Sequence, residues 1–184
     1  MARYWFPKRY ADTVARLRVP SGFLLVAAFG WFSRPSADSL WIGIPASLAG
    51  LALRAWAAGC LAKNRELATT GPYAWMRNPL YVGTLLVACG LCIASRSTGL
   101  SVLFGAVFLF IYLPVIELEE QHLREIFPEY DAYAQRVPAL IPKIPTSRGK
   151  KSNPFQIGLY LNNQEYQASA GFIAGVLFLL WKAS

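Results

Sequence analysis

The sequence has few charged residues for its length. Of its 184 residues, 15% are Asp, Glu, Lys or Arg, 55% are hydrophobic, and the mean hydropathy is +0.34. A water-soluble domain of this size usually has about a quarter charged residues. The apolar residues also come in blocks instead of at amphipathic spacing, so the composition favours an integral membrane protein.

Cysteine and histidine are scarce, with three cysteines and a single histidine, His122. Cys89 and Cys92 form a C-x-x-C pair, a spacing found in zinc and redox sites. Both lie inside an apolar run, however, and no second Cys/His pair completes a zinc site. We interpret them as small apolar side chains that are often buried, and we predict neither a metal site nor a disulfide framework.

The sequence also lacks a G-x-G-x-x-G motif, so a nucleotide-like cofactor would have to bind in another way. The formal net charge of +8 does not indicate a nucleic-acid partner. Nucleic-acid-binding domains place Lys and Arg along one face or among exposed aromatic residues. Here the basic residues flank apolar blocks, as in membrane proteins that contact anionic headgroups. We therefore predict contact with a membrane and none with nucleic acid.

Five apolar blocks predict about five transmembrane helices; they span residues 19–32, 40–61, 80–94, 99–116 and 168–181. A crossing needs about 20 residues, so we expect the first block to begin near Leu17 or to be partly interfacial. We expect the last to extend back toward Tyr166. The second block is rich in small residues that permit close helix packing: Ala46, Ala49, Gly50, Ala57 and Gly59. The prediction is an all-α, polytopic bundle forming one domain over residues 1–184.

Breaks in the pattern predict where these helices end. The short turn at 95–99 makes the third and fourth blocks a hairpin, and Pro114 is expected to break the fourth near its end. Residues 117–137 mix acidic, basic and apolar residues at helical spacing, with Pro128 dividing two helical pieces. Residues 138–154 are rich in proline and basic residues, which predicts an extended surface segment.

Lys and Arg are distributed unequally between the two sides of this bundle. The N-terminal stretch, residues 62–79 and residues 117–167 together contain fourteen of them, including Arg3. The opposite loops and the C-terminal tip contain three: Arg34, Arg96 and Lys182. The bias predicts a cytosolic N-terminus, both polar stretches in the cytosol, and an outside C-terminus.

Residues 69–83, TTGPYAWMRNPLYVG, contain the most informative group of polar and aromatic side chains. Gly71-Pro72 predicts a turn, and Pro79 fits the first turn of the third helix. Tyr73, Arg77 and Tyr81 would place aromatic rings, a guanidinium and free helix N–H groups at the membrane surface. The alternative is an interfacial anchor, because aromatic residues and arginine favour that depth.

A second polar group is formed by the carboxylates Glu117, Glu119 and Glu120, at the predicted inner end of the fourth crossing. Cations are preferred at a helix C-terminus, so these carboxylates are expected to pair with a cation: Arg77, Arg54 or a cationic ligand. Arg54 interrupts the second block, where a charge either serves function or extends to the interface. We expect His122 to be a surface residue.

The segments GPYAWMRNPLYVG and EEQHLREIFPEYDAYAQRVPALIP resemble the isoprenylcysteine carboxyl methyltransferase and phospholipid methyltransferase superfamily. The resemblance covers about residues 40–142 and leaves an extra C-terminal helix at about 166–182. It implies a small helical bundle with a cytosolic pocket for S-adenosyl-L-methionine. The acceptor of the methyl group would be a lipid or lipid-like molecule, either a phospholipid amine or an isoprenylcysteine-type carboxylate, entering from the bilayer.

The resemblance also implies roles for individual residues. Glu120 would be the acidic residue at the reaction centre, and Arg77 would brace the pocket. The residues implied to contact the cofactor are Arg65, Glu66, Leu67, Ala68, Tyr73, Asn78, Pro79, Leu80 and Tyr81. The chemistry is consistent, because aromatic faces and a carboxylate suit the sulfonium cation of S-adenosylmethionine.

Two positions depart from the family's pattern. Asn78 stands where a His is commoner, and an amide cannot titrate. Ile116 stands where enzymes that act on prenylated cysteine have an Arg, so a substrate carboxylate would lose its natural partner. Two alternatives remain beside the methyltransferase: a membrane reductase of the sterol-reductase type that uses NADPH, and a non-enzymatic membrane scaffold.

Overall fold

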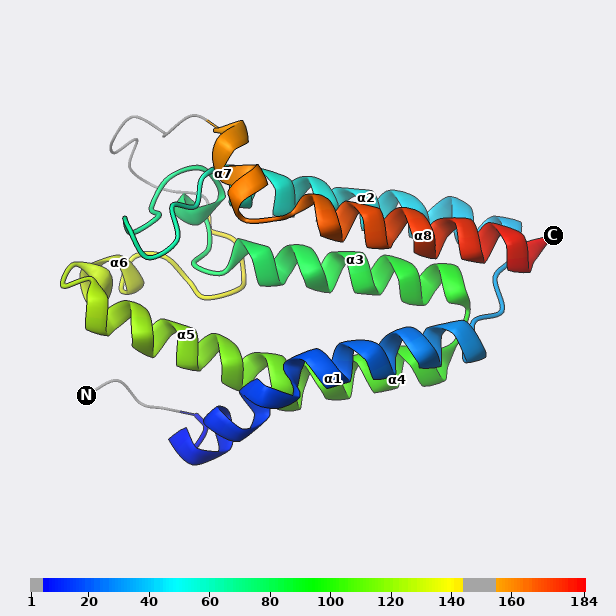
Figure 1. The fold of residues 1–184 in the computed structure, drawn as a ribbon, viewed down its shortest axis with the longest axis horizontal. Coiled ribbons are helices and arrows are strands. Elements are labelled where there is room, and N and C mark those ends of the chain that lie inside the picture. The colour runs from blue at the N-terminus through cyan, green and yellow to red at the C-terminus, as the bar shows by residue number, and fades with distance from the viewer. Residues whose placement is uncertain (1–4, 144–154) are drawn as a thin grey trace.

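The structure is a computed structural model that describes residues 5–143 and 155–184, and all regular secondary structure in those ranges is helical (Figure 1). The longer elements are α1 (Lys8–Phe32), α2 (Ala37–Gly59), α3 (Pro79–Ser95), α4 (Thr98–Val107), α5 (Leu113–Ile126) and α8 (Tyr166–Ala183). The short ones are η1 (Gly71–Ala74), η2 (Phe108–Tyr112), α6 (Tyr130–Ala134) and α7 (Ile157–Asn162).

The helices form a polytopic membrane bundle, as the apolar blocks predict. Four helices are long and apolar enough to cross a bilayer: α1, α2, the continuous run Thr98–Ile126, and α8. The fifth, α3, has 17 residues, which is close to the lower limit for a crossing, about 17. Helix α8 begins at Tyr166, as expected.

Helices α2 and α3 pack with their backbones almost in contact, because glycines line both surfaces. A Cβ atom added to Gly43 would lie 2.4 Å from the carbonyl oxygen of Gly90, and one added to Gly50 would lie 2.6 Å from that of Gly83. Small residues are what permit such an approach between membrane helices. Helix α1 packs on the other side of the bundle, against α4, η2 and α5 (Figure 1).

The predicted break at Pro114 is wrong, since one helix of 29 residues runs from Thr98 to Ile126. Proline has no N–H and cannot donate to the carbonyl four residues earlier, that of Phe110. The π-helical segment η2 shifts the hydrogen-bond register just before Pro114, and the hydroxyl of Tyr10 in α1 donates to the Phe110 carbonyl at 2.8 Å. The helix therefore passes the proline, and the division at Pro128 is confirmed.

Two other expectations need correction. Helix α1 begins at Lys8, well before Leu17, because Ala11 and Val14 are buried and fix the polar first turns to the bundle. Cys89 is exposed on the outer face of α3, although Cys92 is partly buried and both thiols are free. A small apolar thiol is compatible with a lipid-facing surface.

The polar stretches of the chain meet at one end of the bundle. Figure 1 shows the connections after α2 and after α5, with η1, α6 and α7, at the end opposite the C-terminus. The α1–α2 and α3–α4 connections lie at the other end. Which end faces the cytosol stays a prediction. Arg3 and residues 144–154, which include most of the predicted extended segment, lie outside the described residues.

Candidate functional site

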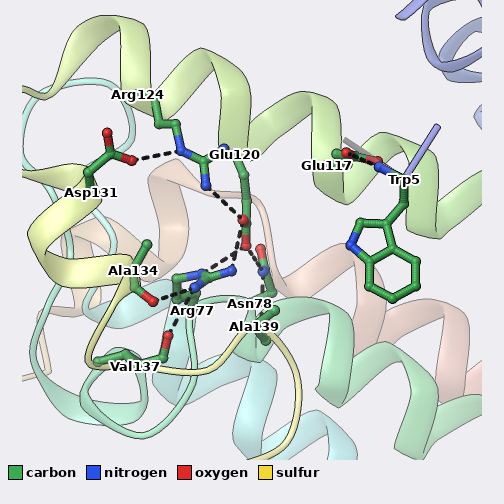
Figure 2. A network of polar contacts seen from close by, with 10 residues as sticks. All are labelled: Trp5, Arg77, Asn78, Glu117, Glu120, Arg124, Asp131, Ala134, Val137 and Ala139. Atoms are coloured by element: carbon green, nitrogen blue, oxygen red, sulfur yellow. Dashed lines mark hydrogen bonds and ion pairs between the residues drawn. The ribbon is translucent and has the colours of Figure 1, made fainter. Parts of the chain in front are cut away.

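Glu120 is the centre of a buried polar network at this end of the bundle (Figure 2). Arg77 donates from Nε to Oε1 and from Nη2 to Oε2 of Glu120, both at 2.9 Å. Asn78 donates from Nδ2 to the same Oε1 at 2.9 Å. Arg124 adds a longer ion pair, with Nη2 at 3.9 Å from Oε2. The carboxylate of Glu120 is therefore surrounded by donors from α5 and from the segment before α3.

The chain after α6 completes this network through its backbone. Arg77 Nη1 donates to the carbonyl oxygens of Ala134 and Val137, at 2.8 and 3.0 Å. The backbone N–H groups of Arg77 and Asn78 donate to the carbonyls of Pro138 and Ala139, at 2.8 and 3.1 Å. These bonds hold the segment before α3 against the segment after α6. The predicted pairing of Arg77 with the acidic run is confirmed, and Glu120 is the residue with which it pairs.

A cavity of about 620 Å³ lies beside the network, between α3, α5 and the loop after α2. Most residues that the resemblance assigned to the cofactor line it: Glu66, Leu67, Ala68, Tyr73, Asn78, Pro79, Leu80 and Tyr81. Arg77 and His122 also line it, and His122 is exposed as expected. Arg65 and Glu120 are not among its lining residues, whereas Glu119 is.

Tyrosines make up much of the cavity wall. Tyr73 is 6% exposed, and its hydroxyl has no hydrogen-bond partner among the described residues. Tyr133 donates its hydroxyl to the backbone carbonyl of Tyr73 at 2.7 Å. Burial raises the pKa of Tyr73, and the nearby Glu165 and Glu119 are among the groups that raise it further. Burial likewise raises the pKa of Tyr133. Both phenols therefore stay protonated: Tyr133 donates its hydrogen bond within the protein, and Tyr73 has one to donate to a ligand.

Glu119, the residue before Glu120, lines the cavity. It accepts a hydrogen bond from the Tyr81 hydroxyl at 2.8 Å, and it lies 3.4 Å from Nη1 of Arg18 in α1. The ring of Tyr81 packs edge to face with that of Tyr112 from η2, with centroids 6.2 Å apart. This wall thus combines one carboxylate with two aromatic rings.

Arg54 forms the opposite wall with a residue from the C-terminal part of the chain. It donates to both carboxylate oxygens of Glu165, at 3.0 and 2.7 Å, to the Leu80 carbonyl at 3.2 Å, and to the Thr84 hydroxyl. The alternative that Arg54 pairs with the acidic run is wrong, because Glu165, the residue before α8, supplies its carboxylate. Asn163 donates to the carbonyls of Ala58 and Leu61 and so caps the end of α2.

Reasoning from sequence missed several cavity residues: Arg18, Tyr112, Asn163 and Glu165. A usable signal existed for Glu165, since the unpaired Arg54 inside an apolar block calls for a carboxylate. None existed for Arg18 or Tyr112, because basic and aromatic residues at the ends of crossings are common for topological reasons.

The cavity residues fit S-adenosylmethionine. The volume lies in the usual range for small-ligand sites, about 300–1,000 Å³. Glu119 and the rings of Tyr81 and Tyr112 suit a cation, and the free Tyr73 hydroxyl has a hydrogen bond to donate. No group of three or more His, Cys, Asp or Glu side chains within residues 5–143 and 155–184 could hold a metal ion; the absence of a bound metal stays a prediction.

These observations define a helical multi-pass membrane protein with a polar, tyrosine-lined cavity at one end. Comparison with known proteins also indicates a membrane methyltransferase family. The phospholipid methyltransferase family matches residues 44–130. The cobalt-zinc-cadmium resistance protein CzcN of Cupriavidus metallidurans is 30% identical over 155 residues, which are 79% of this chain and 71% of CzcN.

Two further relatives match over less of their own length. The Schizosaccharomyces pombe protein-S-isoprenylcysteine O-methyltransferase is 31% identical over 144 residues, 75% of this chain and 61% of that enzyme. The nickel-cobalt-cadmium resistance protein NccN of Alcaligenes xylosoxydans xylosoxydans is 36% identical over 101 residues, 55% of this chain and 47% of NccN. The match thus spans about half the length of NccN. No solved structure matches the chain. The chain belongs to the integral membrane methyltransferase superfamily that includes the isoprenylcysteine carboxyl and phospholipid methyltransferases.

Proposed function

We propose that this membrane protein is an S-adenosylmethionine-dependent methyltransferase that acts on a lipid or lipid-like acceptor. The observation that supports this most directly is the cavity at the polar end of the bundle. It combines an available carboxylate, Glu119, with tyrosine rings and an unpaired tyrosine hydroxyl. A second cavity, beside Trp5 and Phe6, contains neither Glu119 nor a tyrosine.

When bound, S-adenosylmethionine supplies an electrophilic methyl group on a positively charged sulfur. The rings of Tyr81 and Tyr112 would face that charge, and Tyr73 would donate its free hydrogen bond to a polar group of the cofactor. The loop residues Leu67 and Ala68 would cover its flat, apolar part. Enclosure by these side chains excludes water and aligns donor with acceptor, which methyl transfer needs more than acid–base catalysis.

The predicted catalytic pair, Arg77 and Glu120, would act by positioning. Arg77 and Asn78 already donate three hydrogen bonds to the Glu120 carboxylate, so its oxygens are engaged within the protein and Glu120 is not a cavity-lining residue. Glu120 would instead fix Asn78 and the start of α3, which form part of the cavity wall. Glu119, at the adjacent position and facing the cavity, would hold the proton that an ammonium group must lose before it can attack.

The geometry favours an amine over a carboxylate as the reacting group. Ile116 is buried in an apolar cluster with Tyr81 and Phe108, so no cation stands there for an isoprenylcysteine carboxylate. Glu119 attracts an ammonium and repels a carboxylate. A phospholipid amine is therefore the proposed acceptor.

Transfer of label in sealed membrane vesicles tests the activity and its orientation together. Inside-out vesicles that contain the protein should transfer labelled methyl groups from added S-adenosylmethionine to extractable lipid, and right-side-out vesicles should not. This follows if the Lys- and Arg-rich end faces the cytosol. Transfer by right-side-out vesicles alone would reverse the orientation, and transfer by neither would contradict the proposed activity.

Titration of the purified protein separates the alternatives. S-adenosylhomocysteine should bind and NADPH should not. Binding of NADPH alone would support the membrane reductase, and binding of neither compound would support the non-enzymatic scaffold.

A further inference from the structure

Arg18 reaches the cavity from α1, outside the segment that matches the methyltransferase family. Its Nη1 lies 3.4 Å from Oε1 of Glu119, and its guanidinium carbon lies 5.8 Å from the centre of the Tyr81 ring. Arg18 therefore stands directly beside the carboxylate that faces the proposed acceptor. Within the described residues, Arg18 is the cation that pairs with Glu119.

The position of Arg18 along α1 places it at headgroup depth. The residues that follow it are apolar and open to lipid, with Val19, Phe23 and Val26 all strongly exposed. The residues before it include the basic Arg9 and Arg16, which suit a surface with anionic lipids. A long basic side chain at such a boundary extends its charge to the interface. The guanidinium thus lies where the phosphate of a membrane lipid would be.

The pair between Arg18 and Glu119 is the weakest of the three ion pairs that contact the cavity. Its side chains are 47% and 48% exposed and share one contact. In the Arg77–Glu120 pair the side chains are 14% and 10% exposed, and two hydrogen bonds join them. An exposed pair contributes about 0–1 kcal/mol, so a ligand that offers each partner an opposite charge can replace it at little cost.

We propose that Arg18 is a specificity-determining residue that binds the anionic part of the acceptor's headgroup. The Arg18–Glu119 pair opens on binding, the acceptor's ammonium contacts Glu119, and its phosphate contacts Arg18. This rests on the proposed function, in which the acceptor is a phospholipid amine, and adds that a residue of α1, outside the matched family segment, recognises its phosphate. Guanidinium suits this task because its planar donors match two phosphate oxygens at once.

The arrangement selects against lipids that lack either charge. A long-chain amine without a phosphate gains nothing from Arg18, and a carboxylate lipid without an amine is repelled by Glu119. In the unliganded protein, Arg18 also shields Glu119 by pairing with it. Selectivity thus comes from the match between two opposite charges on the protein and two on the headgroup.

The test compares Arg18→Gln and Arg18→Lys with Arg16→Gln as a matched control. Arg16 is exposed, belongs to the same helix, and has no hydrogen bond or ion pair in the described residues. KM would be measured for phosphatidylethanolamine and for a long-chain primary amine without phosphate. Arg18→Gln should raise the first KM about tenfold, in line with the loss of one charge-assisted contact, and should not raise the second, because a phosphate-free amine makes no contact with Arg18. Arg18→Lys should lie between wild type and Arg18→Gln, and Arg16→Gln should match wild type.

A second measurement, equilibrium binding of radiolabelled short-chain phosphatidylethanolamine in neutral detergent, does not depend on turnover. Arg18-dependent binding without methyl transfer would support this inference and overturn the proposed function. Methyl transfer with an unchanged KM in Arg18→Gln would support the proposed function and overturn this inference. An equal rise in KM for both acceptors would also overturn the inference, because Arg18 would then only hold Glu119. Neither binding nor transfer would overturn both.

Discussion

Glu119 and Glu120 are neighbours in the sequence but belong to two different environments. Glu120 is 8% exposed, and its carboxylate accepts hydrogen bonds from Arg77 and Asn78. The Glu119 side chain is 48% exposed and lines the cavity, and its side-chain partners in the described residues are a tyrosine hydroxyl and a partly exposed arginine. Consecutive residues of a helix point about 100° apart, so a single helix supplies one structural and one available carboxylate.

The difference shows that the type of residue does not define its task. A carboxylate that is saturated with donors stabilises the fold and has little capacity left to bind a ligand. A carboxylate whose charged partner is exposed can exchange that partner for a ligand. Substitution of Glu120 should therefore lower mainly the stability of the protein, and substitution of Glu119 should lower mainly the rate of methyl transfer.

The largest effect on stability is expected from Glu120→Gln. The change leaves the Arg77 guanidinium buried without its counter-charge, which costs about 3–5 kcal/mol. The midpoint of thermal unfolding in detergent should fall strongly, and activity should be lost with it. Glu125→Gln, an exposed position on the same helix, is the control and should unfold as wild type does. If Glu120→Gln unfolds like wild type yet is inactive, Glu120 is part of the chemistry and does not only position its neighbours.

Glu119→Gln should give the converse result. The Arg18 pair is exposed, so its loss should change the free energy of unfolding by about 1 kcal/mol or less. The rate of methyl transfer to a phospholipid amine should fall by about 10²–10⁴-fold, the usual contribution of a positioned acid or base. Binding of S-adenosylhomocysteine, measured by calorimetry, should show that the pocket is intact. Wild-type turnover in this variant would remove Glu119 from the mechanism.

Tyr73→Phe should have the smallest effect and tests the cofactor side of the cavity. The hydroxyl has no partner in the described residues, so its removal should leave stability unchanged. If it donates to the cofactor, the affinity for S-adenosylhomocysteine should fall about fivefold to tenfold, the value of one hydrogen bond of about 1 kcal/mol. Tyr133→Phe is the contrasting variant, because it removes the hydrogen bond to the Tyr73 carbonyl and should lower stability. Unchanged affinity in Tyr73→Phe would place the cofactor elsewhere.

Much of the fold could be predicted from sequence because its signals are local. Apolar blocks of sufficient length define crossings, and Pro128 ends α5 where the pattern predicts. Pro114 shows where such reasoning fails. A proline leaves the carbonyl four residues earlier without its usual N–H donor, and whether the helix continues depends on whether another group donates to that carbonyl. Here the donor is the hydroxyl of Tyr10, about a hundred residues earlier in the chain.

The features of the site likewise fall into those that local sequence predicts and those that depend on how the helices pack. The sequence alone determined a helical membrane protein, its polar stretches, and the group of residues around 66–81 that lines the cavity, since each depends on composition, short-range spacing or a continuous motif. Only the tertiary structure decided that Arg77 saturates Glu120, that Glu119 faces the cavity with Arg18, and that Arg54 pairs with Glu165. The physical reason is that a charge near a bilayer must find a partner, and the nearest partner is set by how helices pack and not by distance along the chain.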